Sequence, residues 1–329
     1  MPSTPVLPNG QPINGRYSWL MEINERALAG RPVVQPDFQS RPVSVHDDEY
    51  SRLVMSHPYY GFVGAVVGGI ELLMYSSNDD NVARTYFYYG ADAYETLSLR
   101  LWQRLCMDAN CIFDIGAFTG LYSLIARGTN DRSTCIAFEP MPHIRHRARM
   151  NFVLNGRTDT ILLEPFALSD ATRMLPFYTS VGPTMLDSGG SVTQRSSGEA
   201  VSVDLVQGIS LDQYLVSKPD LKPDLLKIDV EFHETAVLAG ARQMLASSRP
   251  TIIIEVSKQQ TLPEILAVLG SLGYHMFSID EVRQTLHKHK QGITMSSSYD
   301  AVDDVHNLLA CPTQEITAIC ETVAATIAR

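Results

Sequence analysis

An alternation of short apolar runs and helical stretches, which begins at residue 111, constrains the fold more than any other feature. The main apolar runs read "CIFDIG", "TCIAFEP", "DTILLEPFAL", "DLLKIDV" and "RPTIIIEV", and most of them precede a segment with helical spacing. Strands that alternate with helices are typical of βαβ units, whose strands are parallel and buried on both faces. The sequence therefore predicts an α/β protein with a mostly parallel sheet and helices on both faces.

Two regions depart from this alternation. Residues 1–45 are rich in proline and show little periodicity, which indicates an extended arm, with disorder as the alternative. The stretch 61–75 is predicted to form a β-hairpin, and 171–207 a second hairpin with a Gly/Ser-rich loop. We therefore divide the chain into 1–90, an N-terminal arm and hairpin or lid region, and 91–329, the main domain with its insertion.

The charge balance argues against binding to nucleic acid or to an anionic membrane. Lys and Arg total 26 against 36 Asp and Glu, which gives a formal net charge of −10. The basic runs at 145–149 and 287–290 are short, and each is expected to be a solvated face of a helix or loop. The stretch 61–75 contains Glu71 and is shorter than the roughly 20 residues of a spanning helix. No membrane span is therefore expected.

The five cysteines indicate free thiols. Their number is odd and no two form a CxxC pair, which is typical of proteins in a reducing compartment. The amino terminus lacks the basic start and apolar stretch of a signal peptide, so we expect a cytoplasmic location. The aromatic run "YFYY" at 86–89 has two interpretations, a homodimer interface or core packing.

The first strand ends in a glycine-containing turn, "DIGAFTG", with Asp114, Gly116 and Gly120. In an open parallel sheet, ligands bind outside the carboxyl ends of the strands, and glycines let the backbone approach a ligand closely. A turn that binds a diphosphate would read GxGxxG, whereas this one has an acid before its first glycine. The pattern favours a ligand that carries a positive charge.

A second acid follows the next strand, in "FEP". Glu139 lies 25 residues after Asp114, where a carboxylate can accept hydrogen bonds from both hydroxyls of a ribose. NAD and S-adenosylmethionine both contain such a ribose. An NAD-dependent oxidoreductase is the weaker alternative because the GxGxxG turn is absent.

Several short motifs follow one another along the chain: "FDIGAFTGLYSLIA", "FEP", "NFVLNG", "FALSD", "LDQYL", "LLKIDVE", "VLAGA" and "IIIEV". FkbM-type methyltransferases have these motifs in the same order, and the chain resembles that family over about 85–310. The resemblance implies a class I methyltransferase (Rossmann-like) fold, whose seven-stranded sheet has an antiparallel last strand. It also implies S-adenosylmethionine as cofactor and transfer of its methyl group, usually to oxygen. Two positions depart from the family, since Phe118 replaces the usual Asn and Phe232 the usual Gly.

The resemblance implies a cofactor site formed by residues at the strand ends. The turn backbone would approach the methionine portion, Glu139 would accept from the ribose, and Ala167, Leu168 and Ser169 would border the adenine. The predicted cofactor-binding residues are Glu95, Asp114, Gly116, Ala117, Phe118, Gly120, Glu139, Pro140, Ala167, Leu168 and Asp229.

Two of these assignments keep an alternative, and Asn155 is not among them. Asp114 either serves the cofactor ammonium or anchors the turn. Glu95 lies where the family has a lid helix over the cofactor, and its alternative is an exposed acid at a helix start. Asn155, in "NFVLNG", is interpreted as a helix C-cap rather than as a ligand.

The stretch "KIDVEFHE" supplies the predicted catalytic residues, His233 and Asp229. A hydroxyl acceptor needs a base, and a carboxylate beside His233 would raise the pKa of its imidazole towards neutrality. The alternative is a partly exposed helix histidine. Glu231 and Glu234 are expected to serve the N-terminus of the following helix.

Asp229 and Glu255 also form a candidate metal site, because related enzymes hold Mg²⁺ with acids at the ends of these two strands. Val256 stands where those enzymes have a further oxygen donor, so a metal-free mechanism is favoured. The expected activity is O-methylation of a hydroxyl or carboxyl on a natural product, sugar or lipid-like small molecule, with N-methylation of an amine as the alternative.

Overall fold

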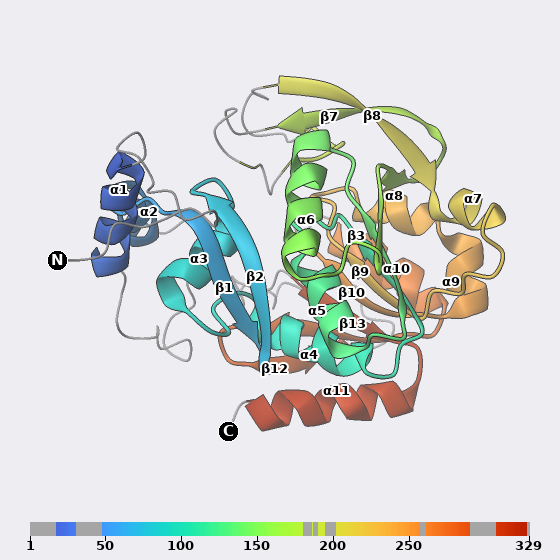
Figure 1. Cartoon of the computed structure of the whole chain (residues 1–329). Coiled ribbons are helices and arrows are strands. Elements are labelled where there is room, and N and C mark those ends of the chain that lie inside the picture. The colour runs from blue at the N-terminus through green and yellow to red at the C-terminus, as the bar shows by residue number, and fades with distance from the viewer. Residues whose placement is uncertain are drawn as a thin grey trace.

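The computed structural model describes residues 18–30, 48–179, 186, 190–194, 202–256, 261–289 and 307–327. Its centre is an eight-stranded sheet in the order β12-β11-β13-β10-β9-β3-β4-β5 (Figure 1). The strands are β3 (Cys111–Ile115), β4 (Thr134–Phe138), β5 (Ile161–Glu164), β9 (Leu225–Ile228), β10 (Thr251–Glu255), β11 (His275–Asp280), β12 (Thr285–Lys288) and β13 (Asn307–Cys311).

The sheet has the predicted mostly parallel topology. β3 pairs in parallel with β4 and β9, β4 with β5, and β9 with β10, whereas β13 runs antiparallel to both β10 and β11. The seven predicted strands with an antiparallel last strand are therefore confirmed. The eighth strand, β12, forms a hairpin with β11, so the basic run at 287–290 begins on an edge strand and the prediction of a helix or loop face was wrong there. Charged side chains on an edge strand discourage pairing with another chain.

Helices cover both faces of the sheet, because successive strand residues point to opposite sides. On β3, Ile112 packs into one apolar core and Phe113 into the other, and both are fully buried. The first core includes α4 (Thr96–Cys106), α5 (Leu121–Thr129), α6 (Pro142–Leu154) and α11 (Gln314–Ile327), and the second includes α7 (Leu211–Val216), α8 (Glu234–Ala239), α9 (Arg242–Ser248) and α10 (Leu262–Ser271). The sequence pattern had not indicated α11.

The helical segment that follows β9 is divided into two helices, α8 and α9, which meet at Gly240. A Cβ on Gly240 would lie 2.0 Å from the carbonyl oxygen of Ser169, so the chain passes too close to its neighbour for any other residue. The Asp212 carboxylate accepts hydrogen bonds from the backbone N–H groups of Gln243 and Met244, at 3.0 and 2.9 Å. These contacts begin α9 as a separate helix.

The strand predicted at 159–168 is also divided, and Pro165 explains why. Proline has no N–H to donate and interrupts strand pairing. β5 joins the central sheet, whereas β6 (Ala167–Ser169) pairs with β8 (Ser202–Ser210), which pairs in turn with β7 (Arg173–Thr179). The predicted insertion hairpin is therefore confirmed as β7 and β8, and it extends beyond the central sheet at the top of Figure 1.

The N-terminal region contains more helix than the sequence indicated. α1 (Ser18–Gly30) and α2 (Asp48–Ser56) are helical, so the prediction of an extended arm was wrong over 18–30. The rest of 1–45 lies outside the described residues. The predicted hairpin is confirmed as β1 (Tyr60–Val67) and β2 (Ile70–Ser77), and α3 (Asn81–Tyr89) follows it.

Side chains of α6 hold the free edge of this hairpin. Asn151 Oδ1 accepts from Tyr75 N–H at 2.9 Å, and Arg147 donates to the Tyr75 carbonyl at 3.2 Å. Asn155 accepts from Leu73 N–H at 2.9 Å and donates to its carbonyl at 2.7 Å. Asn151 and Asn155 are four residues apart on a helix, which is a rise of about 6 Å, and Leu73 and Tyr75 are two residues apart on a strand, which is about 6.6 Å. The two asparagines are therefore spaced to reach both strand residues. The interpretation of Asn155 as a helix C-cap residue is confirmed, and its contact with the hairpin is new.

The aromatic run packs into the core. Tyr86, Phe87 and Tyr88 of α3 are at most 5% exposed, and Phe87 stacks on Tyr59 with ring centres 4.1 Å apart. Core packing is therefore the correct interpretation for these three rings, whereas Tyr89 is half-buried and a homodimer stays a prediction.

The five cysteines are unpaired and buried, as the sequence indicated. Among the described helices, none combines the length and the apolar character that crossing a membrane requires.

Candidate functional site

The glycine turn after β3 lies directly against the end of β9. Gly116 has φ +81° and Gly120 has φ +89°, values that favour glycine. A Cβ on Gly116 would lie 1.7 Å from the carbonyl oxygen of Asp229, so the predicted close approach exists, but to the protein's own backbone. Ala117 between the glycines is buried. Phe118 has φ +49° in the left-handed region, where the asparagine usual in the family is tolerated better than phenylalanine.

Asp114 anchors this turn. Its Oδ2 accepts from the N–H and the hydroxyl of Ser123, at 2.9 and 2.6 Å, and so holds the first turn of α5 against β3. The side chain is buried, and burial raises the pKa of this carboxyl to about 6. Of the two interpretations, the anchor fits these contacts.

Glu139 lies at the end of β4, as predicted, and is buried. Its Oε1 accepts from the N–H of Met141 at 2.8 Å, and burial raises the pKa of the carboxyl to about 8. Pro140 is half-buried, and its carbonyl accepts from Arg145 at 2.8 Å. The backbone of Phe118 also hydrogen-bonds to this carboxyl, so the group is held at the end of the strand, where its oxygens have further lone pairs for a ligand hydroxyl.

Ala167, Leu168 and Ser169 are buried on β6. They belong to the three-stranded sheet rather than to the end of a central strand. Their neighbour across the sheet is β8, and Ser169 also bonds to His233. These residues therefore lie near the "KIDVEFHE" loop, and no described contact joins them to Glu139.

Glu95 begins α4 and is half-buried, so the alternative of an exposed acid is wrong. The hydroxyl of Tyr122 donates to its Oε2 at 2.5 Å. The Glu95 carboxylate also contributes to the raised pKa of Lys227, so it lies on the side of the sheet where β9 ends.

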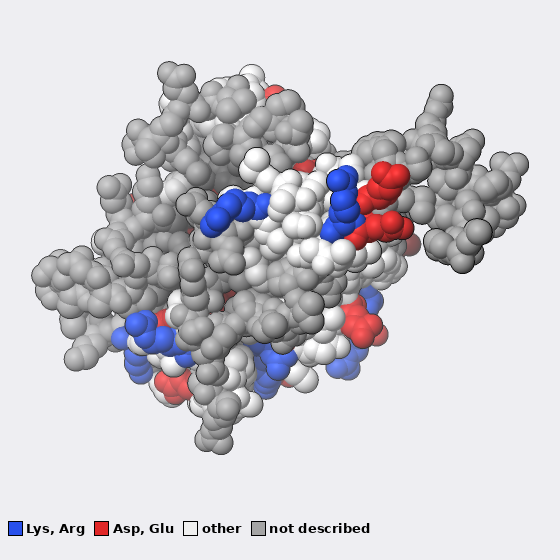
Figure 2. Space-filling view, turned by 90° about the vertical axis from the view of Figure 1, so that its left-hand side faces the viewer, with Lys and Arg blue, Asp and Glu red and all other residues white. Residues whose placement is uncertain are grey.

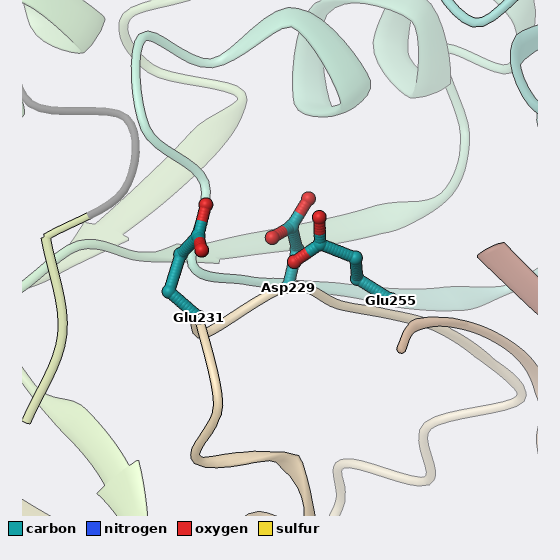
Figure 3. A group of neighbouring side chains, drawn as sticks. All are labelled: Asp229, Glu231 and Glu255. Carbon is teal, nitrogen blue, oxygen red and sulfur yellow. The ribbon is translucent and has the colours of Figure 1, made fainter. Parts of the chain in front are cut away.

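Three carboxylates meet at the carboxyl ends of β9 and β10. Oxygen atoms of Asp229, Glu231 and Glu255 all lie within 4.8 Å of one another. In Figure 3 the three side chains bring their carboxyl groups to one place. Burial raises the pKa of Glu255 well above its ordinary value, and the neighbouring carboxylates of Asp229 and Glu231 raise it further. We call these three residues the acid cluster.

Glu231 is the member of the cluster that sequence reasoning missed. It was expected at the N-terminus of α8, but its φ of +52° turns the side chain back towards Asp229. Phe232 follows at φ +73°, where the family's usual glycine would be unstrained. Glu234 does occupy the helix start, as expected, and accepts from the N–H of Phe232 at 3.1 Å.

Lys227 supplies a buried positive charge beside the cluster. Its ammonium lies 3.0 Å from Asp229 Oδ2, and the lysine side chain is 1% exposed against 28% for the aspartate. Burial opposes the charged form, but the carboxylates of Asp229, Glu95 and Glu255 outweigh it and raise the pKa of Lys227. The lysine therefore stays protonated, and nothing in the local sequence pattern indicated a role for it.

His233 is not paired with Asp229. Its Nε2 lies 2.9 Å from the Ser169 hydroxyl and its Nδ1 lies 3.0 Å from the Thr193 hydroxyl. Burial lowers the pKa of its imidazole, although the Asp170 carboxylate opposes the change. The prediction that the pKa of His233 is raised towards neutrality was wrong, because burial outweighs the effect of the Asp170 carboxylate.

The family of this chain is identified by its sequence. The family model "Methyltransferase FkbM domain" matches residues 114–289, which is more than half of the 329-residue chain. The chain is also similar to Methyltransferase sdnD of Sordaria araneosa, with 27% identity over 188 residues that cover 50% of this chain and 73% of sdnD.

Solved structures give more distant matches. Methyltransferase FkbM from Methylobacillus flagellatus KT matches with 15% identity and a TM-score of 0.39, over 62% of this chain and 43% of that one. The present chain thus spans less than half of the length of that protein. The O-methyltransferase from Bacillus cereus in complex with SAH matches with 12% identity and a TM-score of 0.37, over 65% of this chain and 78% of that one. With its family model matched from the glycine turn to β12, the chain belongs to the FkbM family of S-adenosylmethionine-dependent methyltransferases.

Proposed function

We propose that this methyltransferase transfers a methyl group to an oxygen of a small-molecule acceptor, in the first place a hydroxyl. The observation that carries the proposal is the acid cluster, which lies against the glycine turn through the contact between Gly116 and the Asp229 backbone. A hydroxyl must lose its proton as its oxygen is methylated, and closely spaced carboxylates beside the turn are suited to receive that proton.

S-adenosylmethionine would lie along the carboxyl ends of β3 and β4. The backbone from Gly116 to Gly120 would face its methionine portion, and Glu139 would accept from its ribose hydroxyls. Ala167 and Leu168 would border the adenine only if it reaches the three-stranded sheet. Glu95 and Asp229 would flank the positively charged end of the cofactor, since both carboxylates lie near Lys227.

In the reaction, the acceptor oxygen attacks the methyl carbon, the bond from that carbon to the sulfonium sulfur breaks, and S-adenosylhomocysteine leaves. The acceptor proton passes to a carboxylate of the acid cluster, with Asp229 in first place. His233 is the alternative base, because its imidazole is neutral near pH 7 and one ring nitrogen must accept a hydrogen bond. Alignment of acceptor and cofactor would supply much of the acceleration.

A divalent cation is the second way to activate a hydroxyl. Asp229, Glu231 and Glu255 offer the oxygen ligands that Mg²⁺ prefers, and a bound cation would lower the pKa of a hydroxyl beside it. The Lys227 ammonium already supplies a positive charge beside this cluster, which favours the metal-free route. Unchanged activity in excess EDTA would support that route, and restoration by Mg²⁺ after EDTA would reject it.

The acceptor is proposed to be a natural product, sugar or lipid-like molecule. On the face in Figure 2, the described Lys and Arg side chains are interspersed with Asp and Glu rather than gathered in one broad basic surface. Together with the net charge of −10, this is in keeping with a partner that is not a nucleic acid.

Calorimetric titration with S-adenosylmethionine tests the first step, and NAD is the matched control ligand. We expect binding of S-adenosylmethionine alone. A cell extract incubated with labelled cofactor then reveals the acceptor as the compound that gains the labelled methyl group. A product methylated on nitrogen would replace O-methylation by N-methylation.

Two variants separate the candidate bases once an acceptor is known. Asp229→Asn removes the first candidate base, and His233→Asn keeps hydrogen-bonding capacity at position 233 but cannot take a proton. We expect turnover to fall more in Asp229→Asn, by about 10²-fold, the usual contribution of a positioned acid or base. The opposite order would assign the proton transfer to His233.

A further inference from the structure

Lys227 makes a three-way contact that fixes the position of its ammonium group. The Nζ atom donates to Asp229 Oδ2 at 3.0 Å and to Asn307 Oδ1 at 3.2 Å, and it lies 5.0 Å from the centre of the Tyr122 ring. An ammonium has three protons to direct, and a carboxylate, an amide oxygen and an aromatic face are three suitable partners. Of the lysines that the structure describes, this is the buried one.

The contacts continue from Lys227 to the start of α4. Asn307 Nδ2 donates to the Ser98 hydroxyl at 3.2 Å. The N–H groups of Leu97 and Ser98 donate to the two carboxylate oxygens of Glu281, at 2.8 and 2.9 Å, and so complete the first turn of the helix. β9, β13, α4 and the turn between β11 and β12 are therefore joined by one set of buried polar contacts.

A parallel route connects Lys227 to Glu95. The Tyr122 ring lies against the ammonium, and the hydroxyl of the same ring donates to Glu95 Oε2. Glu95 and Asp229 come from segments more than 130 residues apart, yet both are held by groups that contact Lys227.

We propose that Lys227 is a positioning residue for methyl transfer, whose ammonium holds the Asp229 carboxylate at the end of β9 and ties it to the start of α4, where Glu95 lies. This inference rests on the proposed function, because it concerns how the residues that face the cofactor are kept in place. Lys227 itself is too deeply buried to touch a ligand.

The arrangement explains why a buried charge is retained in the sheet. Without a cation, the Asp229 carboxylate would be repelled by the neighbouring carboxylate of Glu231. With the ammonium on the opposite side, the carboxylate is drawn towards the sheet and its orientation is set. Asn307 and Tyr122 in turn prevent the long lysine side chain from choosing another partner.

A double-mutant cycle on cofactor binding tests the proposal. Calorimetry measures S-adenosylmethionine affinity in the wild type, Lys227→Met, Asp229→Asn and the double variant, with Lys222→Met, an exposed lysine, as the matched control. Circular dichroism checks that each variant is folded. We expect Lys227→Met and Asp229→Asn each to weaken binding by about tenfold, and the double variant to bind no more than about threefold worse than the weaker single one. Lys227→Arg should recover part of the loss because it keeps the positive charge.

The results distinguish a failure of the proposed function from a failure of the positioning role of Lys227. A wild type that does not bind S-adenosylmethionine rejects the proposed function. A wild type that binds, together with a Lys227→Met variant of equal affinity, rejects the positioning role alone. So does a double variant whose loss is the product of the two single losses, because independent residues would give that result. If Lys227→Met does not fold, Asn307→Ala decides, since it leaves the lysine in place but removes its second partner: weaker binding supports the role, and unchanged binding rejects it.

Discussion

Two turns with similar sequences lie at the ends of adjacent strands of the central sheet, and they differ in the surroundings of their aspartates. "DIGAFTG" begins with the last two residues of β3 and "DVEFHE" follows β9, and each contains an aspartate and a phenylalanine. In both, the phenylalanine has a left-handed backbone, with φ +49° at Phe118 and +73° at Phe232. Both phenylalanines replace the residues usual in the family, Asn and Gly, which adopt this conformation at lower cost.

The aspartates of the two turns differ in their surroundings. Asp114 is buried, and it accepts hydrogen bonds from the N–H and the hydroxyl of Ser123. Asp229 is partly exposed, with the carboxyl groups of Glu231 and Glu255 on one side and the Lys227 ammonium on the other. The first turn is thus held by bonds that stabilise it, whereas the second gathers charge that the fold must balance. Perturbed carboxyls held close together are typical of sites that carry out chemistry.

The largest expected effect comes from a change that forces the two turns apart. Gly116→Ala would place a Cβ 1.7 Å from the Asp229 carbonyl oxygen, on a backbone with φ +81°. Because backbone atoms must move, we expect the free energy of unfolding to fall by about 3 kcal/mol and cofactor binding to be lost. Thermal unfolding and calorimetry measure both quantities.

Gly69→Ala is the matched control for this variant. Gly69 has nearly the same backbone, φ +83°, but no atom lies within 4 Å of its added Cβ. It should cost only the left-handed strain, about 1 kcal/mol, and leave binding intact. Equal losses in the two variants would mean that the contact between the turns does not matter.

The next largest effect compares Asp114, whose carboxyl anchors the first turn, with Glu255, whose carboxyl lies among other carboxyl groups. Asp114→Ala leaves two donors of Ser123 without their partner, so we expect a loss of about 2–3 kcal/mol in the free energy of unfolding. Glu255→Gln should change it by less than about 1 kcal/mol, because the pKa of Glu255 is raised and the amide resembles the protonated acid. Denaturant titration of both variants near pH 7 makes the comparison. A larger loss in Glu255→Gln would reverse the roles assigned to the two turns.

The sequence predicted the sheet, the glycine turn and the acids at the strand ends because each depends on a local pattern. Apolar alternation marks strands, and a chain that leaves a parallel strand must place its next residues at the carboxyl edge. Asp114, Glu139, Asp229 and Glu255 were therefore found at the expected ends of β3, β4, β9 and β10.

The partners of these residues could not be predicted, because they come from distant parts of the chain. His233 contacts Ser169 and Thr193, 64 and 40 residues away, so the expected pairing with Asp229 failed. Lys227 looks like one polar residue in an apolar strand until Asn307, 80 residues later, is seen beside it. Glu231 belongs to the acid cluster because its backbone has a positive φ. The sequence did not indicate this conformation, since glutamate and the phenylalanine after it rarely adopt it.

A smaller effect concerns the pH dependence of cofactor binding on the side of the first turn. Burial raises the pKa of Glu139 to about 8, so the carboxyl of the unliganded protein is largely protonated at pH 7. If the ionised form accepts from the ribose, binding releases this proton, and affinity should rise with pH up to about 8, by at most about tenfold per pH unit. Calorimetry in buffers of different ionisation enthalpy measures the released proton. Glu139→Gln should bind more weakly at pH 8 and lose the dependence, and a wild type with no dependence would contradict the assignment.

The smallest expected effect concerns a feature that both turns share, a phenylalanine with a left-handed backbone. Phe232→Gly removes a left-handed strain of about 1 kcal/mol, and the flexibility of glycine costs about as much, so the free energy of unfolding should change by less than about 1 kcal/mol. Phe62→Gly is the control, because Phe62 is an exposed phenylalanine, at 57%, within β1, where glycine brings its cost without relieving strain. Chemical denaturation should therefore show a larger loss for Phe62→Gly than for Phe232→Gly. The reverse order would mean that the Phe232 ring makes packing contacts worth more than its strain, and that the second turn, like the first, is held in place by its own side chains.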